Sequence, residues 1–246
     1  MDFSNTDTNI DAIENPISPV NNGSDYKSGT AKGRNMSQRS FNIERQSFDI
    51  IESEIGGHSY TDDQWAIVRR VIHATADFDF AKNCRIVFHE RAIESAFLAI
   101  SKKSFIVSDV EMVLHGINKR LLSEMGMEGV CYINDPECIE NSKKFNMTRS
   151  ELAMHKAIDK INNGIVVIGN APTALYQLIS LINEKKVKPL LVVGIPVGFV
   201  SAVESKSDLM NTDIPFITNH GRKGGSSAAS SIINALLLLY SSKKYR

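Results

Sequence analysis

Residues 165–175, with the sequence IVVIGNAPTAL, set the class of fold that this chain can adopt. The run Ile165–Ile168 is short, apolar and of strand length, and a glycine follows it. Pro172 is a common first residue of a helix, and a helical pattern of apolar residues continues from it to Glu184. A buried strand that turns through glycine into a helix is typical of a parallel sheet covered by helices.

The same alternation of strand and helix recurs along the chain. Further short apolar runs of strand length are found at Ser104–Val107, Val130–Ile133, Leu190–Val193 and Pro215–Thr218. Helical patterns lie beside them at Glu90–Ile100, Glu111–Ile117, Pro136–Ser142, Ser150–Ile161, Ala202–Met210 and Ser226–Tyr240. We therefore predict an α/β fold, a three-layer sandwich with a five-stranded parallel β-sheet flanked by helices.

Two more helices are predicted before the first of these strands. A helix that contains Ile51 ends at Gly56-Gly57. A second helix carries Trp65–His73, in which apolar residues repeat at helical spacing, and Asp62 or Asp63 can cap it.

The N-terminal residues differ in composition from the rest of the chain. Residues 1–40 are rich in Asn, Ser, Asp, Gly and Thr, and their aromatic residues are Phe3 and Tyr26. Such a segment buries too little apolar surface to offset the entropy that is lost on ordering it. We predict a disordered tail over residues 1–40 and one α/β domain over residues 41–246.

Charge and cysteine content narrow the partners and the compartment. The 28 basic and 28 acidic residues give a net charge of zero, which gives no reason to expect nucleic acid or a membrane as a partner. The longest apolar run, near Ala235–Tyr240, is far shorter than a membrane span. The cysteines, 3 in number, form no CxxC pair, so we expect reduced thiols in a cytoplasmic protein and no metal site.

The end of the Trp65–His73 helix holds the first candidates for chemistry. Arg70 and His73 lie three residues apart and share a helix face, and Asp77 would reach the His73 ring if the helix continued that far. Histidine suits proton transfer because its ordinary pKa, about 6.5, lies near neutrality. A lone histidine on a helix is more often a surface or core residue, so these residues alone leave both roles open.

The loops that follow the predicted strands form a second group of candidates. Ligands of an open parallel sheet bind beyond the carboxyl ends of its strands. Three of these loops contain glycine, which lets the backbone approach a ligand, and each leads into a helix N-terminus, which favours an anion. Glycine and proline also serve ordinary tight turns, but three such loops at one edge favour a pocket for carboxylates or phosphates, to which Lys223 would add a cation. In these loops we predict the substrate-binding residues Asn170, Thr173, Gly198, Arg222, Gly224 and Gly225.

Motifs for nucleotide binding or nucleophilic catalysis are absent from the sequence. It contains no GxxxxGK[ST], no GxGxxG after a strand, no HExxH and no GxSxG. The segment Glu204-Ser205-Lys206 resembles a Ser/Lys arrangement, but a charged start to a helix is the simpler interpretation. A proton donor in an anion-lined cavity is the chemistry that the residues support.

Several motifs, taken together and in this order, resemble the precorrin-8X methylmutase family of cobalamin and porphyrin biosynthesis. The resemblance covers about Ile43 to Leu239. The motifs that carry it are Ile43–Phe48, Arg70–His73, Gly169–Leu175, Pro196–Val200, Glu204–Lys206 and Gly221–Ser226.

This resemblance implies an isomerase that moves a methyl group between neighbouring ring-C carbons of precorrin-8 or cobalt-precorrin-8, to give hydrogenobyrinate or cobyrinate. It implies a homodimer that holds the tetrapyrrole at or near the subunit interface, and no redox or nucleotide cofactor. His73 stands at the position of a histidine that serves as proton donor and acceptor. Ser47 and Arg70 match substrate-binding positions of the family.

Three further segments indicate the form of the substrate, and the sequence leaves two other functions open. The segments Ala74–Phe78, Ile117–Lys119 and Cys131–Ile133 are similar to members of the anaerobic, cobalt-early branch, so we expect cobalt-precorrin-8 as substrate, a corrinoid as product and cobalt carried within the substrate. A corrinoid-binding carrier without turnover would use the same anion-lined cavity. A nucleotide- or S-adenosylmethionine-binding transferase is favoured only by Asp109, at the end of the first predicted strand.

Overall fold

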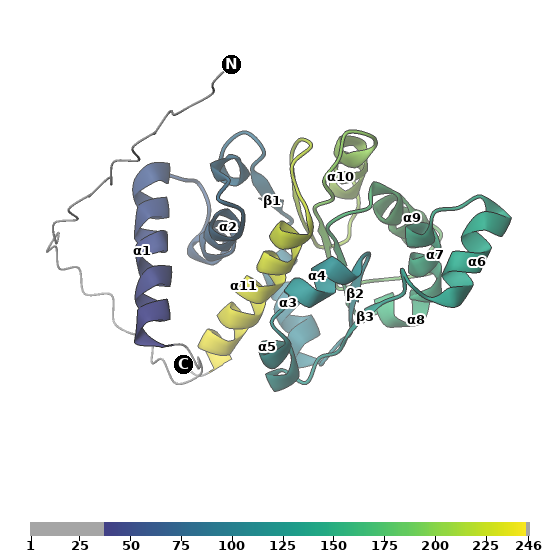
Figure 1. Ribbon diagram of the computed structural model, residues 1–246, viewed down its shortest axis with the longest axis horizontal. Helices are drawn as coiled ribbons and strands as arrows, with labels where there is room; N and C mark the ends of the chain where they lie inside the picture. The colour runs from purple at the N-terminus through teal and green to yellow at the C-terminus, as the bar shows by residue number, and fades with distance from the viewer. Residues whose placement is uncertain (1–36, 245–246) are drawn as a thin grey trace, which may run out of the picture. The chain divides into compact units, whose positions relative to one another are not determined.

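The computed structural model describes residues 37–244, and the predicted tail falls almost entirely on residues 1–36, outside the described part. Its compact unit, Met36–Arg246, contains one sheet with the strand order β1-β6-β5-β4-β2-β3 (Figure 1). The strands span Ile86–Phe88 (β1), Ile106–Ser108 (β2), Gly129–Cys131 (β3), Ile165–Ile168 (β4), Leu191–Gly194 (β5) and Phe216–Asn219 (β6).

The predicted α/β fold is confirmed, but the number of strands was wrong. The strands predicted from the sequence are β2 to β6, and their pairings, β3 with β2, β2 with β4, β4 with β5 and β5 with β6, are all parallel. The sixth strand, β1, is antiparallel to β6, with Val87 opposite Thr218. The run Ile86–Phe88 pairs only at the edge of the sheet and runs against the other strands, so its strand character depends on its distant partner β6.

Helices account for most of the remaining described chain. They span Gln38–Ile55 (α1), Asp62–Thr75 (α2), Ala92–Ser101 (α3), Glu111–Gly116 (α4), Lys119–Glu124 (α5), Pro136–Phe145 (α6), Arg149–Lys156 (α7), Ile158–Ile161 (α8), Pro172–Asn183 (α9), Ala202–Met210 (α10) and Ser226–Lys244 (α11), with a 3-10 turn at Phe78–Ala81 (η1). Helix α1 begins within the residues assigned to the tail, the predicted Ser150–Ile161 helix is divided at Ala157, and α5 and η1 were not predicted. In residues 37–244, no helix has the length and apolar character that a membrane crossing requires.

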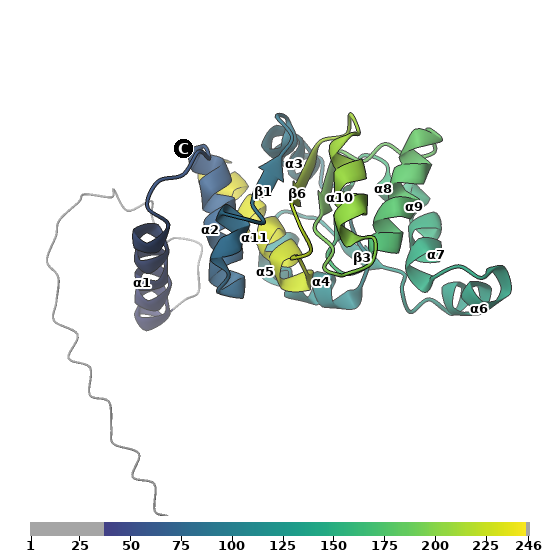
Figure 2. The same cartoon turned by 90° about the horizontal axis from the view of Figure 1, so that it is seen from above.

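Both faces of the sheet are buried by helices, and β4 shows how the sequence achieves this. Ile165 and Val167 belong to a core cluster that includes residues of α2, α3 and α11. Val166 and Ile168 point to the opposite face, into a cluster with residues of α7, α9 and α10. Figure 2 shows α2 and α11 on one side of the sheet and α9 and α10 on the other. A continuous apolar run is therefore what this central strand needs.

Helix α2 begins with a capping box that the sequence analysis did not identify. The Thr61 side chain accepts a hydrogen bond from the Gln64 backbone N–H, and the Gln64 side chain accepts one from the Thr61 backbone N–H at 3.1 Å. The prediction that Asp62 or Asp63 caps the helix was wrong, because both lie in its first turn. There their carboxylates still favour the positive end of the helix dipole.

We expect Thr61→Ala to lower the free energy of unfolding by about 1 kcal/mol, because the first turn of α2 loses its side-chain acceptor. Urea denaturation followed by circular dichroism measures this change. Thr61→Ser is the matched control, since serine keeps the hydroxyl oxygen, and it should retain most of the stability. Equal stability of the alanine variant and the wild type would contradict this role of Thr61.

Candidate active site

Phe48 of α1 packs against three side chains from the second half of α2. The guanidinium carbons of Arg69 and Arg70 lie 4.3 and 5.4 Å from the centroid of the Phe48 ring. The His73 ring meets the same ring edge to face, with 5.3 Å between the centroids. His73 is exposed on its other side, so an aromatic ring orients the imidazole while leaving it accessible.

Ion pairs between α1 and α2 fix the arginines beside His73. Arg70 Nη1 lies 3.0 Å from Glu44 Oε1, and Arg69 Nη1 lies 2.6 Å from Glu52 Oε1. Ser47 lies on the same stretch of α1, but its hydroxyl donates to the carbonyl of the residue four positions earlier, at 2.8 Å. The structure thus gathers the predicted residues Ser47, Arg70 and His73 at one helix pair, with Arg70 already ion-paired.

The carboxylate of Asp77 has a different partner from the one considered in the sequence analysis. Helix α2 ends at Thr75, and Ala76 takes the left-handed conformation, with φ 52°. Beyond this turn, Lys223 Nζ lies 2.7 Å from a carboxylate oxygen of Asp77 and 2.7 Å from one of Asp79. The condition for Asp77 to reach the His73 ring, a longer helix, is not met.

These ion pairs also change the role expected for Lys223. The hydrogen bonds that Lys223 donates to Asp77 and Asp79 raise the pKa of Lys223 above its usual range, and the one that it donates to Asp79 lowers the pKa of Asp79. Lys223 was expected to add a cation for a bound anion. Instead its ammonium joins the end of α2 to the loop between β6 and α11, and Arg222 beside it is the exposed cation of that loop.

The structure brings the loops after β5 and β6 together, as expected for one edge of a parallel sheet. The Gly225 N–H donates to the Ile195 carbonyl at 3.0 Å, and the Gly198 N–H donates to the Arg222 carbonyl at 3.2 Å. Any Cβ at Gly224 would overlap the Ile195 carbonyl oxygen. Glycine is therefore required at this position by close backbone approach.

A buried carboxylate binds the backbone of the loop after β4. Asp109, fully buried at the end of β2, accepts hydrogen bonds from the backbone N–H groups of Gly169, Asn170 and Ala171 at 3.1, 2.8 and 2.7 Å. Burial raises the pKa of Asp109, and these three hydrogen bonds oppose that rise. The N–H groups that we expected to meet a ligand anion at this loop are therefore bound by the protein itself.

The remaining residues of this loop divide between two neighbours. Gly169 lies against the start of α11, since a Cβ there would be 3.0 Å from the Cα of Ser226. Asn170 is exposed beside it. Thr173 is turned toward α7, where its hydroxyl forms a 3.1 Å hydrogen bond with Thr148. Asn170 thus lies near the glycine loop after β6, whereas the Thr173 hydroxyl has a structural partner.

Asp109 also bears on the nucleotide-binding alternative. β2 lies between β3 and β4, so the chain reverses its direction across the sheet between β2 and β4. Ligands of doubly wound folds bind at such a switch point. Here the Asp109 carboxylate occupies it and bonds the neighbouring loop. The feature that favoured a nucleotide-binding transferase has a structural role.

Three elements of this site could not be predicted from the sequence, for identifiable reasons. Phe48 has helical spacing with Ile51 and Ile55 and so reads as a core residue. The pairing of Lys223 with Asp77 spans 146 positions in the chain, which no local pattern reveals. Lys206 follows a helix start and reads as a surface charge, but it is 1% exposed.

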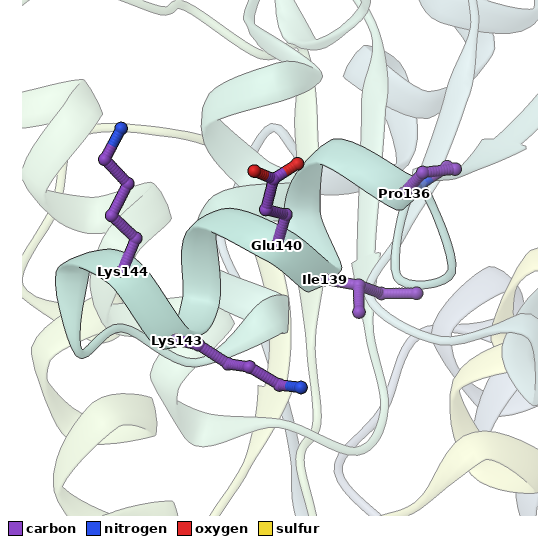
Figure 3. Close-up of a pocket in the computed structure, with 5 residues that line it drawn as sticks. All are labelled: Pro136, Ile139, Glu140, Lys143 and Lys144. Atoms are coloured by element: carbon purple, nitrogen blue, oxygen red, sulfur yellow. The ribbon is translucent and has the colours of Figure 1, made fainter.

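Two surface hollows lie apart from these residues. One, of about 690 Å³, lies on α6 and is lined by Pro136, Ile139, Glu140, Lys143 and Lys144 (Figure 3). A second, of about 250 Å³, lies near the start of α2, with His58, Tyr60 and Arg85 in its wall. Neither hollow is lined by His73, Arg222 or the glycines of the loops. The candidate site is therefore identified by the side chains and loops that the fold brings together, and it does not coincide with either hollow.

The fold and the site define an α/β protein with an accessible histidine beside loops that carry a cation and closely packed glycines. The family model for precorrin-8X methylmutase matches residues 42–239. The chain belongs to the precorrin-8X methylmutase family, and it is an isomerase of cobalamin biosynthesis.

Individual relatives agree with this assignment. The cobalt-precorrin-8 methylmutase of Leptospira interrogans is 46% identical over 213 residues, which cover 83% of this chain and 96% of that protein. The one from Priestia megaterium is 47% identical over 197 residues, covering 80% and 87%. The crystal structure of precorrin-8X methylmutase from Thermus thermophilus has a TM-score of 0.76 at 37% identity, covering 81% of this chain and 96% of that one.

We expect Asp109→Asn to lower the free energy of unfolding by about 2–4 kcal/mol. An amide offers one acceptor oxygen, so at least one of the three N–H groups bound to Asp109 loses its partner, and each such loss costs about 1–3 kcal/mol when the group is buried. Urea denaturation measures the change.

The matched control is Asp135→Asn, because Asp135 caps α6 at a partly exposed position and asparagine caps a helix equally well. This control should cost less than about 1 kcal/mol, even with the loss of the surface ion pair to Lys156. Equal losses in the two variants would show that Asp109 is an ordinary cap.

Proposed function

We propose that this chain acts on cobalt-precorrin-8 and moves a methyl group between neighbouring ring-C carbons to give cobyrinate. The observation that carries this proposal is its likeness to the Leptospira protein, named a cobalt-precorrin-8 methylmutase, over 96% of that protein's length. The Priestia protein carries the same name. The cobalt-early features of residues 74–78, 117–119 and 131–133 favour the same form of the substrate.

The proposed proton donor and acceptor is His73. A methyl shift on a conjugated macrocycle is a rearrangement, so it needs no protein nucleophile. Protonation of a ring nitrogen draws electrons toward it and lowers the barrier, and the same imidazole recovers the proton after the shift. A positioned general acid contributes about 10²–10⁴-fold in rate. The accessible imidazole, oriented by the Phe48 ring, supports this role.

The proposed binding residues act on the carboxylate arms of the macrocycle. Arg222 is exposed on the loop after β6, and a guanidinium binds carboxylates in a two-pronged manner. Arg70 lies beside His73 and is held there by its ion pair with Glu44, so its guanidinium is the second proposed contact for a carboxylate arm of the substrate. Gly198, Gly224 and Gly225 let the backbone of the two loops approach the ring.

No further cofactor is proposed, because the rearrangement transfers no electrons to or from the protein. Cobalt enters as part of the substrate. The three cysteines among the described residues are free thiols, and a cytoplasmic location stays a prediction.

The activity is tested with purified protein and cobalt-precorrin-8 without oxygen, with absorbance recording the conversion to cobyrinate. We expect His73→Ala to lower kcat by about 10²–10⁴-fold, because the proton donor is lost. The matched control is His115→Ala, which removes an exposed histidine of α4 and should leave kcat unchanged. An active His73→Ala enzyme would overturn the role of His73, and stoichiometric binding without conversion by the wild type would favour a corrinoid carrier.

The exposed side chains after β5 support a homodimer with this loop at the interface. Phe199 is 87% exposed and Val200 82%, and Val197 and Val203 beside them are also exposed. Contiguous exposed apolar residues mark contact sites. Because Phe199 lies 5.6 Å from the Arg222 guanidinium, a partner at this loop would stand next to the proposed substrate. We propose that the second subunit and the substrate share this surface.

Sedimentation velocity tests the dimer. We expect the wild type to sediment as a dimer and Phe199→Asp to shift it toward monomer, because a carboxylate at the interface is costly to desolvate. Phe145→Asp, at a phenylalanine of α6 that is 56% exposed, is the matched control and should remain dimeric. A monomeric wild type would refute the dimer, and a fully dimeric Phe199→Asp would move the interface elsewhere.

A further inference from the structure

Lys206 of α10 is a buried lysine in a position where a surface charge was expected. It is 1% exposed. Its ammonium donates to Asn219 Oδ1 at 3.1 Å and to the Lys223 carbonyl at 2.8 Å. Lysine is almost never buried without partners, so these two acceptors account for its position.

Asn219, the last residue of β6, extends this contact to the turn that follows. Its side-chain N–H groups donate to the carbonyls of His220 and Lys223 at 2.8 and 2.9 Å, and more weakly to that of Cys84 at 3.4 Å. Lys206 and Asn219 therefore bind the backbone between residues 220 and 223 from inside the protein. The Lys223 carbonyl accepts from both.

The outer side of the same turn is held by other segments. The Lys223 side chain pairs with Asp77 and Asp79, and the Arg222 carbonyl accepts from the Gly198 N–H. The internal contacts fix the height of the turn above the sheet, and the external ones fix it against α2 and the loop after β5. Arg222 projects from the turn between these attachments.

Binding a turn through a buried ammonium has a large desolvation cost. Burial lowers the pKa of Lys206 to about 8, which shows that the protein opposes its charge. An apolar side chain of similar length would avoid the desolvation cost, and buried charges are often replaceable without loss of stability. What methionine cannot supply is a hydrogen bond to the Lys223 carbonyl.

We propose that Lys206 is a positioning residue that holds the 220–225 segment in the conformation in which Arg222, Gly224 and Gly225 receive the carboxylate arms of the tetrapyrrole. This proposal rests on the proposed function of the site. Lys206 itself is buried and acts only through the backbone of the turn. Its loss should therefore weaken substrate binding more than it slows the chemical step at His73.

The test compares Lys206→Met with wild type by hydrogen exchange, product titration and turnover. We expect faster amide exchange confined to residues 220–225, and at least a tenfold rise in the Kd for cobyrinate, measured by absorbance. KM should rise in parallel, while kcat at saturation changes by less than about threefold. Lys206→Gln, which keeps a shorter donor, should show a smaller change and guards against misfolding of the methionine variant.

Lys156→Met is the matched control, because Lys156 is also bound twice, to Asp135 and Glu137, but on α7. It should leave Kd, KM and exchange at residues 220–225 unchanged. Two outcomes overturn the positioning role while leaving the function intact. They are wild-type values of Kd and KM in both Lys206 variants, and faster exchange spread over the whole domain with Kd unchanged. A wild type that neither binds nor converts the tetrapyrrole overturns the proposed function, and the positioning role with it.

Discussion

The ion pairs of Lys223 with Asp77 and Asp79 join the two parts of the candidate site. Asp77 and Lys223 are 146 positions apart in the chain, yet their side-chain atoms lie 2.7 Å apart. One partner directly follows the helix that carries His73, and the other lies in the loop that carries Arg222. The pair is half exposed, so its contribution to overall stability is small. Its effect is geometric, since it keeps the end of the helix that carries His73 beside the loop that carries Arg222.

The position of the candidate site is related to the switch point of the sheet, between β2 and β4, which a protein side chain fills. In doubly wound folds the crevice between the two central strands receives the ligand. Here Asp109 enters it and binds three backbone N–H groups of the neighbouring loop. The loop after β4 thus supports the site, and the surface left for a ligand moves to β5, β6 and α2. The buried Asp109 carboxylate is therefore the feature that separates the candidate site from the usual ligand position of this type of fold.

The sequence predicted the central architecture well because that architecture is local. Runs such as Ile165–Ile168 are buried on both faces, and glycine or proline after most of the predicted strands marks the turn, so five strands and most helices were found. Strand β1 was missed because it is an antiparallel edge strand outside the set of parallel strands, and its pairing with β6 is distant in sequence. Lys206 and Asp109 were misread for the same reason. The sequence around a charged residue does not show whether its side chain faces water or binds a turn inside the protein. Only the tertiary contacts distinguish the two.

The exposure of His73 connects binding to catalysis in the proposed function. A proton donor in water competes with solvent, whereas exclusion of water strengthens its interaction with a developing charge. The described chain leaves His73 open, and it also leaves Phe199 and Val200 exposed at the nearby loop. A large macrocycle with apolar faces and carboxylate arms matches both needs, since it covers the imidazole and satisfies Arg222. Occupation of the site and desolvation of the acid are then one event. In the proposed function, the imidazole is therefore an effective acid only when the substrate is in place.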